Sequence, residues 1–255
     1  MKWAAWIPLL LLLIAAGEPP SDFAFHQNLG MQVPLDVELR DDSGREAPLR
    51  EFIGGTPAIL ALGYFQCPNL CGTVRADMLS ALAASGLRAP EDYTLLPVSV
   101  DPSETSVDAR AARQTDISRF DLHGAEQAWH YLTGKANSLA QIEAAVGFRA
   151  RFDPALKQFL HPAGLVLLTS SGVVSGYLLG VGYSPGDLSA AVVRARDGRV
   201  ARTASPILLL CFHFDPVTGR YTLAVTRVLE FASALTVLGL GTMLGLAFRR
   251  ERRSR

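Results

Sequence analysis

A continuous apolar run over residues 57–65 constrains the fold of this chain more than any other feature. The run reads Pro-Ala-Ile-Leu-Ala-Leu-Gly-Tyr-Phe and holds no charged side chain. Such a run is typical of a strand buried on both faces, which needs a layer of structure on each side of its sheet. Residues 72–85 follow, with Val74, Met78 and Leu82 at helical spacing. A strand that leads into a helix predicts an α/β domain.

Strand and helix patterns alternate from there to residue 196. The apolar fraction of 49% and charged fraction of 19% are consistent with a real core and argue against disorder. A short hairpin is expected before residue 50. Further strands are predicted at 93–100, 128–133, 148–152, 164–169 and 173–179, and further helices at 103–118, 138–146 and 184–196. This order matches a thioredoxin-like fold with an N-terminal hairpin extension.

Apolar segments at both ends predict export and a membrane anchor. Residues 1–17 have the basic start, short apolar run and small terminal residues of a signal peptide. Residues 228–248 carry only Glu230 as a charge, and five arginines follow in 249–255. This pattern is typical of a transmembrane helix with a cytoplasmic basic tail.

The predicted organisation is therefore an exported domain over 18–196 and a linker with an apolar segment over 197–227, followed by the span. The domain would face the periplasm or exterior of a bacterial-type cytoplasmic membrane. The chain has 24 basic and 24 acidic residues, so its formal net charge of zero argues against a nucleic-acid partner.

Cys67 and Cys71 lie where the first predicted strand gives way to its helix. Ligand sites gather at strand ends in α/β sheets, and a helix N-terminus stabilises a thiolate. Three residues separate the two cysteines, one more than in the Cys-x-x-Cys motif of redox proteins, which favours joint metal ligation. A structural disulfide is the alternative, although it does not explain the strand-end position.

A third ligand is expected from His161, which directly precedes the predicted strand 164–169 and should lie opposite the cysteine loop. A purely structural role is the alternative for this histidine. Two thiolates and one imidazole form a soft donor set of low coordination number, which favours copper as Cu(I) or Cu(II). A structural zinc site would need a fourth ligand.

Cys211 and His213 form a second pair, on the same side of an extended segment. This pair could handle a metal ion as an auxiliary site. The plainer interpretation is that Cys211 is a buried thiol in an apolar strand.

Several motifs in order resemble the Sco/SenC family over roughly residues 25–195. They are Tyr64 to Cys71 with Pro68, Ser99-Val100-Asp101-Pro102, Trp129-x-x-Leu132-Thr133-Gly134, and His161 before a strand. Family members are membrane-tethered copper proteins of thioredoxin fold that assist assembly of the CuA site in cytochrome c oxidase subunit II.

The resemblance implies thiolate ligands at Cys67 and Cys71, an imidazole ligand at His161 and a supporting acidic residue at Asp101. Two features depart from the family. The predicted span is C-terminal, where many relatives have an N-terminal one, and Pro162 directly follows the histidine.

The resemblance predicts a membrane-tethered copper metallochaperone rather than an enzyme. Such a protein would pass copper to subunit II by ligand exchange, after reduction of its cysteine pair. The alternative is a thiol-disulfide oxidoreductase that keeps the subunit's cysteines reduced, with Cys67 as attacking thiol and no need for His161. A peroxidase of the peroxiredoxin type is disfavoured because Tyr64 replaces the usual threonine. A non-catalytic membrane scaffold is a further alternative.

Overall fold

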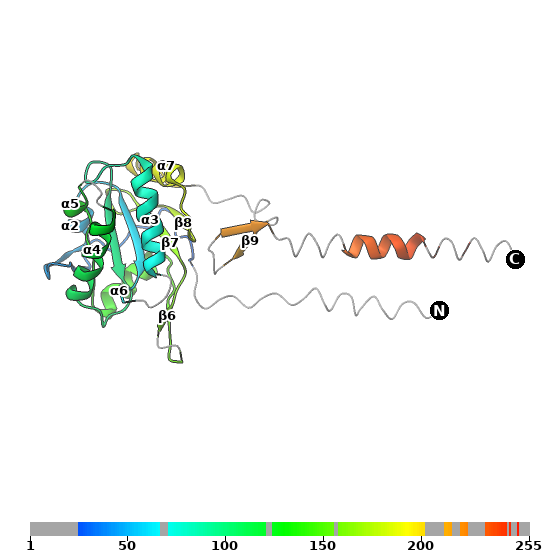
Figure 1. Cartoon of the computed structure of the whole chain (residues 1–255), viewed down its shortest axis with the longest axis horizontal. Helices are drawn as coiled ribbons and strands as arrows, with labels where there is room; N and C mark the ends of the chain where they lie inside the picture. The colour runs from blue at the N-terminus through cyan, green and yellow to red at the C-terminus, as the bar shows by residue number, and fades with distance from the viewer. Residues whose placement is uncertain are drawn as a thin grey trace.

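The computed structural model describes residues 25–66, 71–120, 124–155, 158–201, 212–215, 220–223, 233–243, 245 and 249, with the backbone alone for 71, 212–215 and 220–223. A four-stranded sheet of order β4-β3-β7-β8 forms the centre of the domain (Figure 1). The strands are β3 (Ala58–Gly63), β4 (Thr94–Ser99), β7 (Gly164–Leu168) and β8 (Val174–Leu179). β4 is parallel to β3, whereas β7 is antiparallel to β3 and β8 is antiparallel to β7.

Helices cover both faces of this sheet, because the buried strands alternate their side chains between two cores. Ile59 and Leu165 pack on one face with residues of α3 (Cys71–Ser85), α4 (Ser106–Phe120) and α7 (Pro185–Arg196). The other face carries residues of two shorter helices, α2 (Leu49–Ile53) and α6 (Ala136–Ala145).

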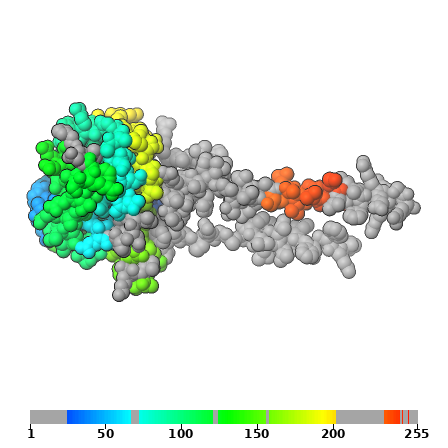
Figure 2. Space-filling view, in the orientation of Figure 1, coloured from blue at the N-terminus to red at the C-terminus, as the bar shows by residue number. Residues whose placement is uncertain are grey.

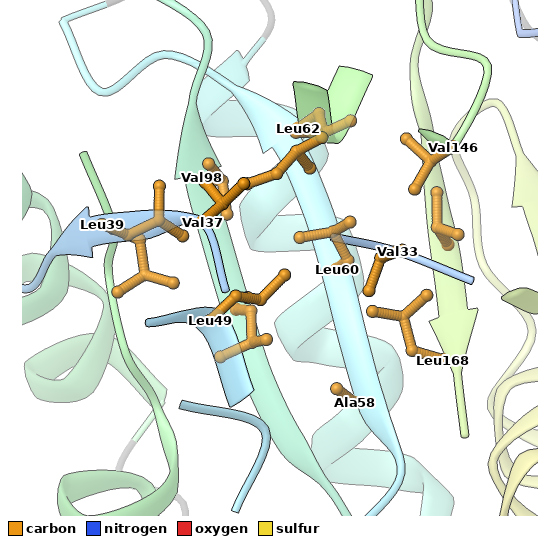
Figure 3. Packing of buried hydrophobic residues seen from close by; sticks show 14 of the residues in the cluster. Val33, Val37, Leu39, Leu49, Ala58, Leu60, Leu62, Val98, Val146 and Leu168 are labelled. Carbon is orange, nitrogen blue, oxygen red and sulfur yellow. The ribbon is translucent and has the colours of Figure 1, made fainter. Parts of the chain in front are cut away.

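The second core also receives the segment that precedes the sheet. Val33, Val37 and Leu39 pack there against Leu60 and Leu168 (Figure 3). A last short helix, α5 (Ala125–Ala128), lies between α4 and α6 in the chain.

Three two-stranded hairpins complete the described elements. The strands β1 (Glu38–Arg40) and β2 (Glu46–Pro48) form the predicted N-terminal hairpin. β5 (Arg151–Asp153) pairs with β6 (Gln158–Leu160), and this hairpin projects from the lower edge of the domain (Figure 2). The third pairs β9 (Phe212–Asp215) with β10 (Arg220–Leu223).

Three element predictions need correction. The strand expected over 148–152 is found instead at Arg151–Asp153, as β5. The stretch 128–133 is not a regular strand, because α5 occupies its start and only isolated bridges follow, from Trp129 to Leu95 and from Leu132 to Val98. The helix expected over 103–118 begins at Ser106, because Asp101 and Ser103 form a turn before it.

The prediction of a C-terminal transmembrane helix over 228–248 is wrong, and the location at a membrane through that single span is wrong with it. Among the described residues, no helix combines the length and apolar character needed to cross a bilayer. The helical stretch there runs over 233–243 and is exposed. The predicted signal peptide over 1–17 lies outside the described residues and stays a prediction.

Candidate metal centre

The candidate site lies at the carboxyl end of β3, the second strand from one edge of the sheet. β3 ends at Gly63, residues 67–70 lie outside the described part of the chain, and the backbone of Cys71 opens α3. The cysteine pair thus spans the predicted junction of strand and helix.

Sheet topology brings two further segments to this end of β3. β4 is parallel to β3, with Ser99 in register with Gly63, so the segment after β4 lies on one flank. β7 is antiparallel to β3, so the segment before β7, which contains His161, lies on the other. The predicted meeting of His161 with the segment that leads into the cysteine loop follows from this arrangement.

His161 is half-buried among aromatic rings. Its ring centroid lies 5.9 Å from that of Tyr64 and 5.8 Å from that of Phe148. Its Nδ1 lies 3.1 Å from the carbonyl oxygen of Pro162. A carbonyl oxygen only accepts hydrogen bonds, so this contact places the proton on Nδ1 and the lone pair on Nε2. Burial lowers the pKa of His161, although the contact with Pro162 opposes it, and the imidazole is therefore in the neutral form that binds metals.

A small cavity of about 30 Å³ connects the histidine with the end of β3 and the start of α3. Its lining includes Tyr64, Phe65, Val74, Arg75 and His161. The structure therefore places His161 beside the residues that flank the cysteine pair on both sides. Within the described residues, which exclude both thiols, no group of three or more histidine, cysteine, aspartate or glutamate side chains could hold a metal ion.

A buried ion pair that sequence analysis missed borders this cavity. Arg75 Nε donates to Asp116 Oδ2 at 2.7 Å, and the hydroxyl of Tyr131 donates to the same oxygen at 2.7 Å. Burial, together with the neighbouring carboxylate, raises the pKa of Tyr131 well above its usual value, so the tyrosine stays protonated. The ion pair joins α3 to α4 just below the site.

Asp101, expected as a supporting residue, has its carboxylate in a local turn. Its Oδ1 accepts hydrogen bonds from the Ser103 backbone N–H at 2.8 Å and the Ser103 hydroxyl at 2.6 Å. Its backbone carbonyl accepts from the N–H of Glu104. The structure thus shows Asp101 shaping the turn after β4, and a role at a metal site stays a prediction.

Glu104 is a further residue that sequence analysis missed. Its side chain is buried and accepts hydrogen bonds from the N–H groups of Phe65 and Gln66, at 2.8 and 2.6 Å. The available signal was an acidic residue in the turn that follows a buried strand. That signal indicates only a helix start, because a hydrogen bond to distant backbone leaves no pattern in the sequence.

The auxiliary pair is placed only in part. Cys211 lies outside the described residues, and the backbone of His213 belongs to β9, in register with Thr222 of β10. A metal-handling role for this pair stays a prediction.

Together, the mixed sheet with helices on both faces and the strand-end cysteine pair define a thioredoxin-like domain. The family model SCO1/SenC matches residues 31–195, which is more than half of the chain. The chain therefore belongs to the SCO1/SenC family, which confirms the resemblance seen in its motifs. A search of curated proteins found no match to this sequence.

Solved structures with the same fold include family members. A proposed electron transfer protein from Aquifex aeolicus VF5 is 25% identical with a TM-score of 0.59, and the match covers 67% of this chain and 95% of that one. ScoI from Arabidopsis thaliana, whose structure has copper bound, is 16% identical with a TM-score of 0.51, over 63% and 96% of the chains. BsSco, of the Sco family of cytochrome c oxidase assembly proteins, is 18% identical with a TM-score of 0.51, over 67% and 96%.

Proposed function

We propose that this protein binds copper through Cys67, Cys71 and His161 and delivers it during assembly of cytochrome c oxidase, to the CuA site of subunit II. Family membership supports the general role. The observation that carries the proposal is the position of a half-buried, neutral His161 beside the residues that flank the cysteine pair.

The chemistry of the donor set supports copper as the cargo. Two thiolates and a neutral imidazole are soft to intermediate ligands, which suit Cu(I) and also accept Cu(II). The contact of Nδ1 with the Pro162 carbonyl fixes the ring orientation and leaves Nε2 as the coordinating nitrogen, a common arrangement around metal-binding histidines. Delivery would proceed as thiolates of the acceptor replace the protein's sulfurs one at a time, so that the ion is never released.

The test is a competition for Cu(I) between the reduced full-length chain and a chromophoric chelator. Wild type should retain one copper ion, and His161→Ala should weaken retention by about tenfold or more. His130→Ala is the matched control, because His130 is also half-buried with a pKa lowered by burial, but packs against Phe52 away from β3. Retention equal to wild type in His161→Ala would remove this residue from the site.

A second assay separates delivery from thiol chemistry. Copper-loaded protein is mixed with the reduced apo CuA domain of subunit II, and the CuA absorption is followed. Transfer by wild type and its loss in His161→Ala support the proposal. Protein that binds no copper but reduces the disulfide of the oxidised CuA domain, equally well in wild type and His161→Ala, would replace the proposal with a thiol-disulfide oxidoreductase.

A further inference from the structure

The Glu104 carboxylate makes three hydrogen bonds at the end of β3. Oε2 accepts from the Phe65 N–H at 2.8 Å and from the Ser99 hydroxyl at 2.5 Å, and Oε1 accepts from the Gln66 N–H at 2.6 Å. Glu104 is only 9% exposed. Both oxygens are thus occupied, and two of the three donors are backbone groups of the segment that leads into the cysteine loop.

Gln66 is also tied to the same part of the chain by its side chain. Its Nε2 donates to Oδ1 of Asp108, whose other carboxylate oxygen accepts from the N–H and the hydroxyl of Thr105, at 2.7 and 2.8 Å. Thr105 immediately precedes α4. The residue directly before Cys67 is therefore held to the start of α4 at two points, one through its backbone and one through its side chain.

The backbone contacts matter more for the position of the loop. A peptide N–H removed from water needs an acceptor, and a carboxylate makes stronger hydrogen bonds than a neutral group. Gln66 directly precedes Cys67, so holding its amide limits the positions that the next residue can reach. The N–H of Val100 also donates to the carbonyl of Gly63, which holds the two strand ends together.

We infer that Glu104 is a positioning residue for the cysteine pair: it holds the backbone of Phe65 and Gln66, the two residues that lead into Cys67, and so controls the reactivity of that thiol. Asp101 acts indirectly, because its hydrogen bonds with Ser103 and Glu104 shape the turn that places Glu104 beside Phe65 and Gln66. The inference deepens the proposed function, on which it rests for the role of the cysteine pair.

The chain offers a matched control for a purely structural role. Asp41, in the β1–β2 turn, is 8% exposed and accepts from two backbone N–H groups and one hydroxyl, those of Ser43 and Arg45. It therefore resembles Glu104 in burial and in the kinds of donors it binds. It belongs to a hairpin that contributes nothing to the lining of the site.

The test compares Glu104→Gln with Asp41→Ala in the reduced, copper-free full-length chain. Alkylation by iodoacetamide is followed by peptide mass spectrometry, and the rate at Cys67 is divided by the rate at Cys71. In Glu104→Gln an amide NH₂ group, which cannot accept a hydrogen bond, faces a backbone N–H donor. The ratio of the Cys67 rate to the Cys71 rate should therefore change by about tenfold. Asp41→Ala should leave the ratio within about twofold of wild type, even where both variants lower the unfolding temperature equally.

A wild-type ratio in folded Glu104→Gln overturns the inference, and so does an equal change in Asp41→Ala. If Glu104→Gln does not fold, Glu104→Asp replaces it, because the shorter carboxylate keeps its charge but loses reach. Its ratio should move in the same direction, and a wild-type ratio there also overturns the inference. Copper binding is measured in parallel. A wild-type chain that binds no copper contradicts the proposed function, while the alkylation ratio still decides the role of Glu104.

Discussion

The two flanks of the carboxyl end of β3 differ in chemistry. On the flank next to β4, the polar side, Ser99, Glu104 and Asp108 make hydrogen bonds. On the flank next to β7, the aromatic side, rings of Phe148 and Tyr64 surround His161. The polar side holds backbone in place, whereas burial on the aromatic side lowers the pKa of the imidazole. The proposed site would use both, because its thiolates must be positioned and its histidine must be unprotonated to bind a metal ion.

Two glutamates show the same contrast. Glu104, on the polar side, is surrounded by three donors. Glu143 lies on α6, three residues before Val146 and five before Phe148 of the aromatic side. Burial alone raises the pKa of Glu143 to about 7. The buried Glu104 carboxylate is thus held by donors, whereas the half-buried Glu143 carboxylate loses solvation without gaining, among the described residues, a partner that lowers its pKa.

The largest effect is expected from Phe148→Ala, which breaks the aromatic side. Phe148 is 3% exposed, and its ring lies 5.1 Å from that of Phe25 and 5.8 Å from that of His161. Removing a buried ring leaves a cavity, so the free energy of unfolding in urea should fall by about 3–5 kcal/mol. Phe152→Ala is the control, because that ring is 49% exposed and should cost less than about 1 kcal/mol. Equal losses in the two variants would show that the aromatic side contributes no special packing.

A smaller, pH-dependent effect is expected from Glu143→Gln. The folded protein holds the Glu143 proton up to a pKa of about 7, against 4.5 for the ordinary group. The contribution of Glu143 to stability is therefore greatest below about pH 4.5 and is lost as the pH rises towards 7. Because this side chain is partly open to solvent, the loss is about 1 kcal/mol.

Urea unfolding of Glu143→Gln between pH 4 and 8 tests this expectation. The variant should become more stable than wild type as the pH rises, and the difference should level off above pH 7. Parallel pH profiles of the two proteins would show that burial of this carboxylate has no cost.

The smallest effect is expected from Asp108→Asn, which weakens the exposed part of the polar side. Asp108 caps α4 through Thr105, and this hydrogen bond to backbone is the main cause of its lowered pKa. The variant should lose about 0.5 kcal/mol in thermal unfolding at pH 7. The difference should vanish as the pH falls through the lowered pKa, because the wild-type carboxylate is then protonated as well. A loss that persists at pH 2 would assign the effect to shape rather than charge.

Local patterns in the sequence predicted the parts of the fold that depend on local burial. The apolar run gave the position of β3, and the spacing of Met78 and Leu82 gave the helix that follows it. The strand expected over 128–133 does not form. Its apolar residues are buried, but they pair with β4 only through isolated bridges and not through a regular ladder. The transmembrane prediction over 228–248 rested on composition alone, and among the described residues no helix is both long and apolar enough to cross a membrane.

The candidate site could be predicted only as far as its chemistry is carried by residue type. Cysteine and histidine are recognisable in the sequence as soft to intermediate metal ligands. The strand that follows His161 indicated where this histidine lies relative to the sheet. Glu104 and the pair of Arg75 with Asp116 could not be found, because each joins segments far apart in the chain. Their partners are set by the order of strands in the sheet, which no local pattern encodes.

The way Glu104 binds its neighbours has a consequence for how the sequence can vary. The carboxylate contacts the N–H of residue 66 and so, for this bond, ignores that residue's side chain. Every amino acid except proline supplies such a group. Any residue except proline can therefore replace Gln66 without loss of the backbone hydrogen bond to Glu104. Such a substitution removes only the side-chain hydrogen bond to Asp108. Glu104 therefore holds this segment through a group that almost any residue at position 66 would supply.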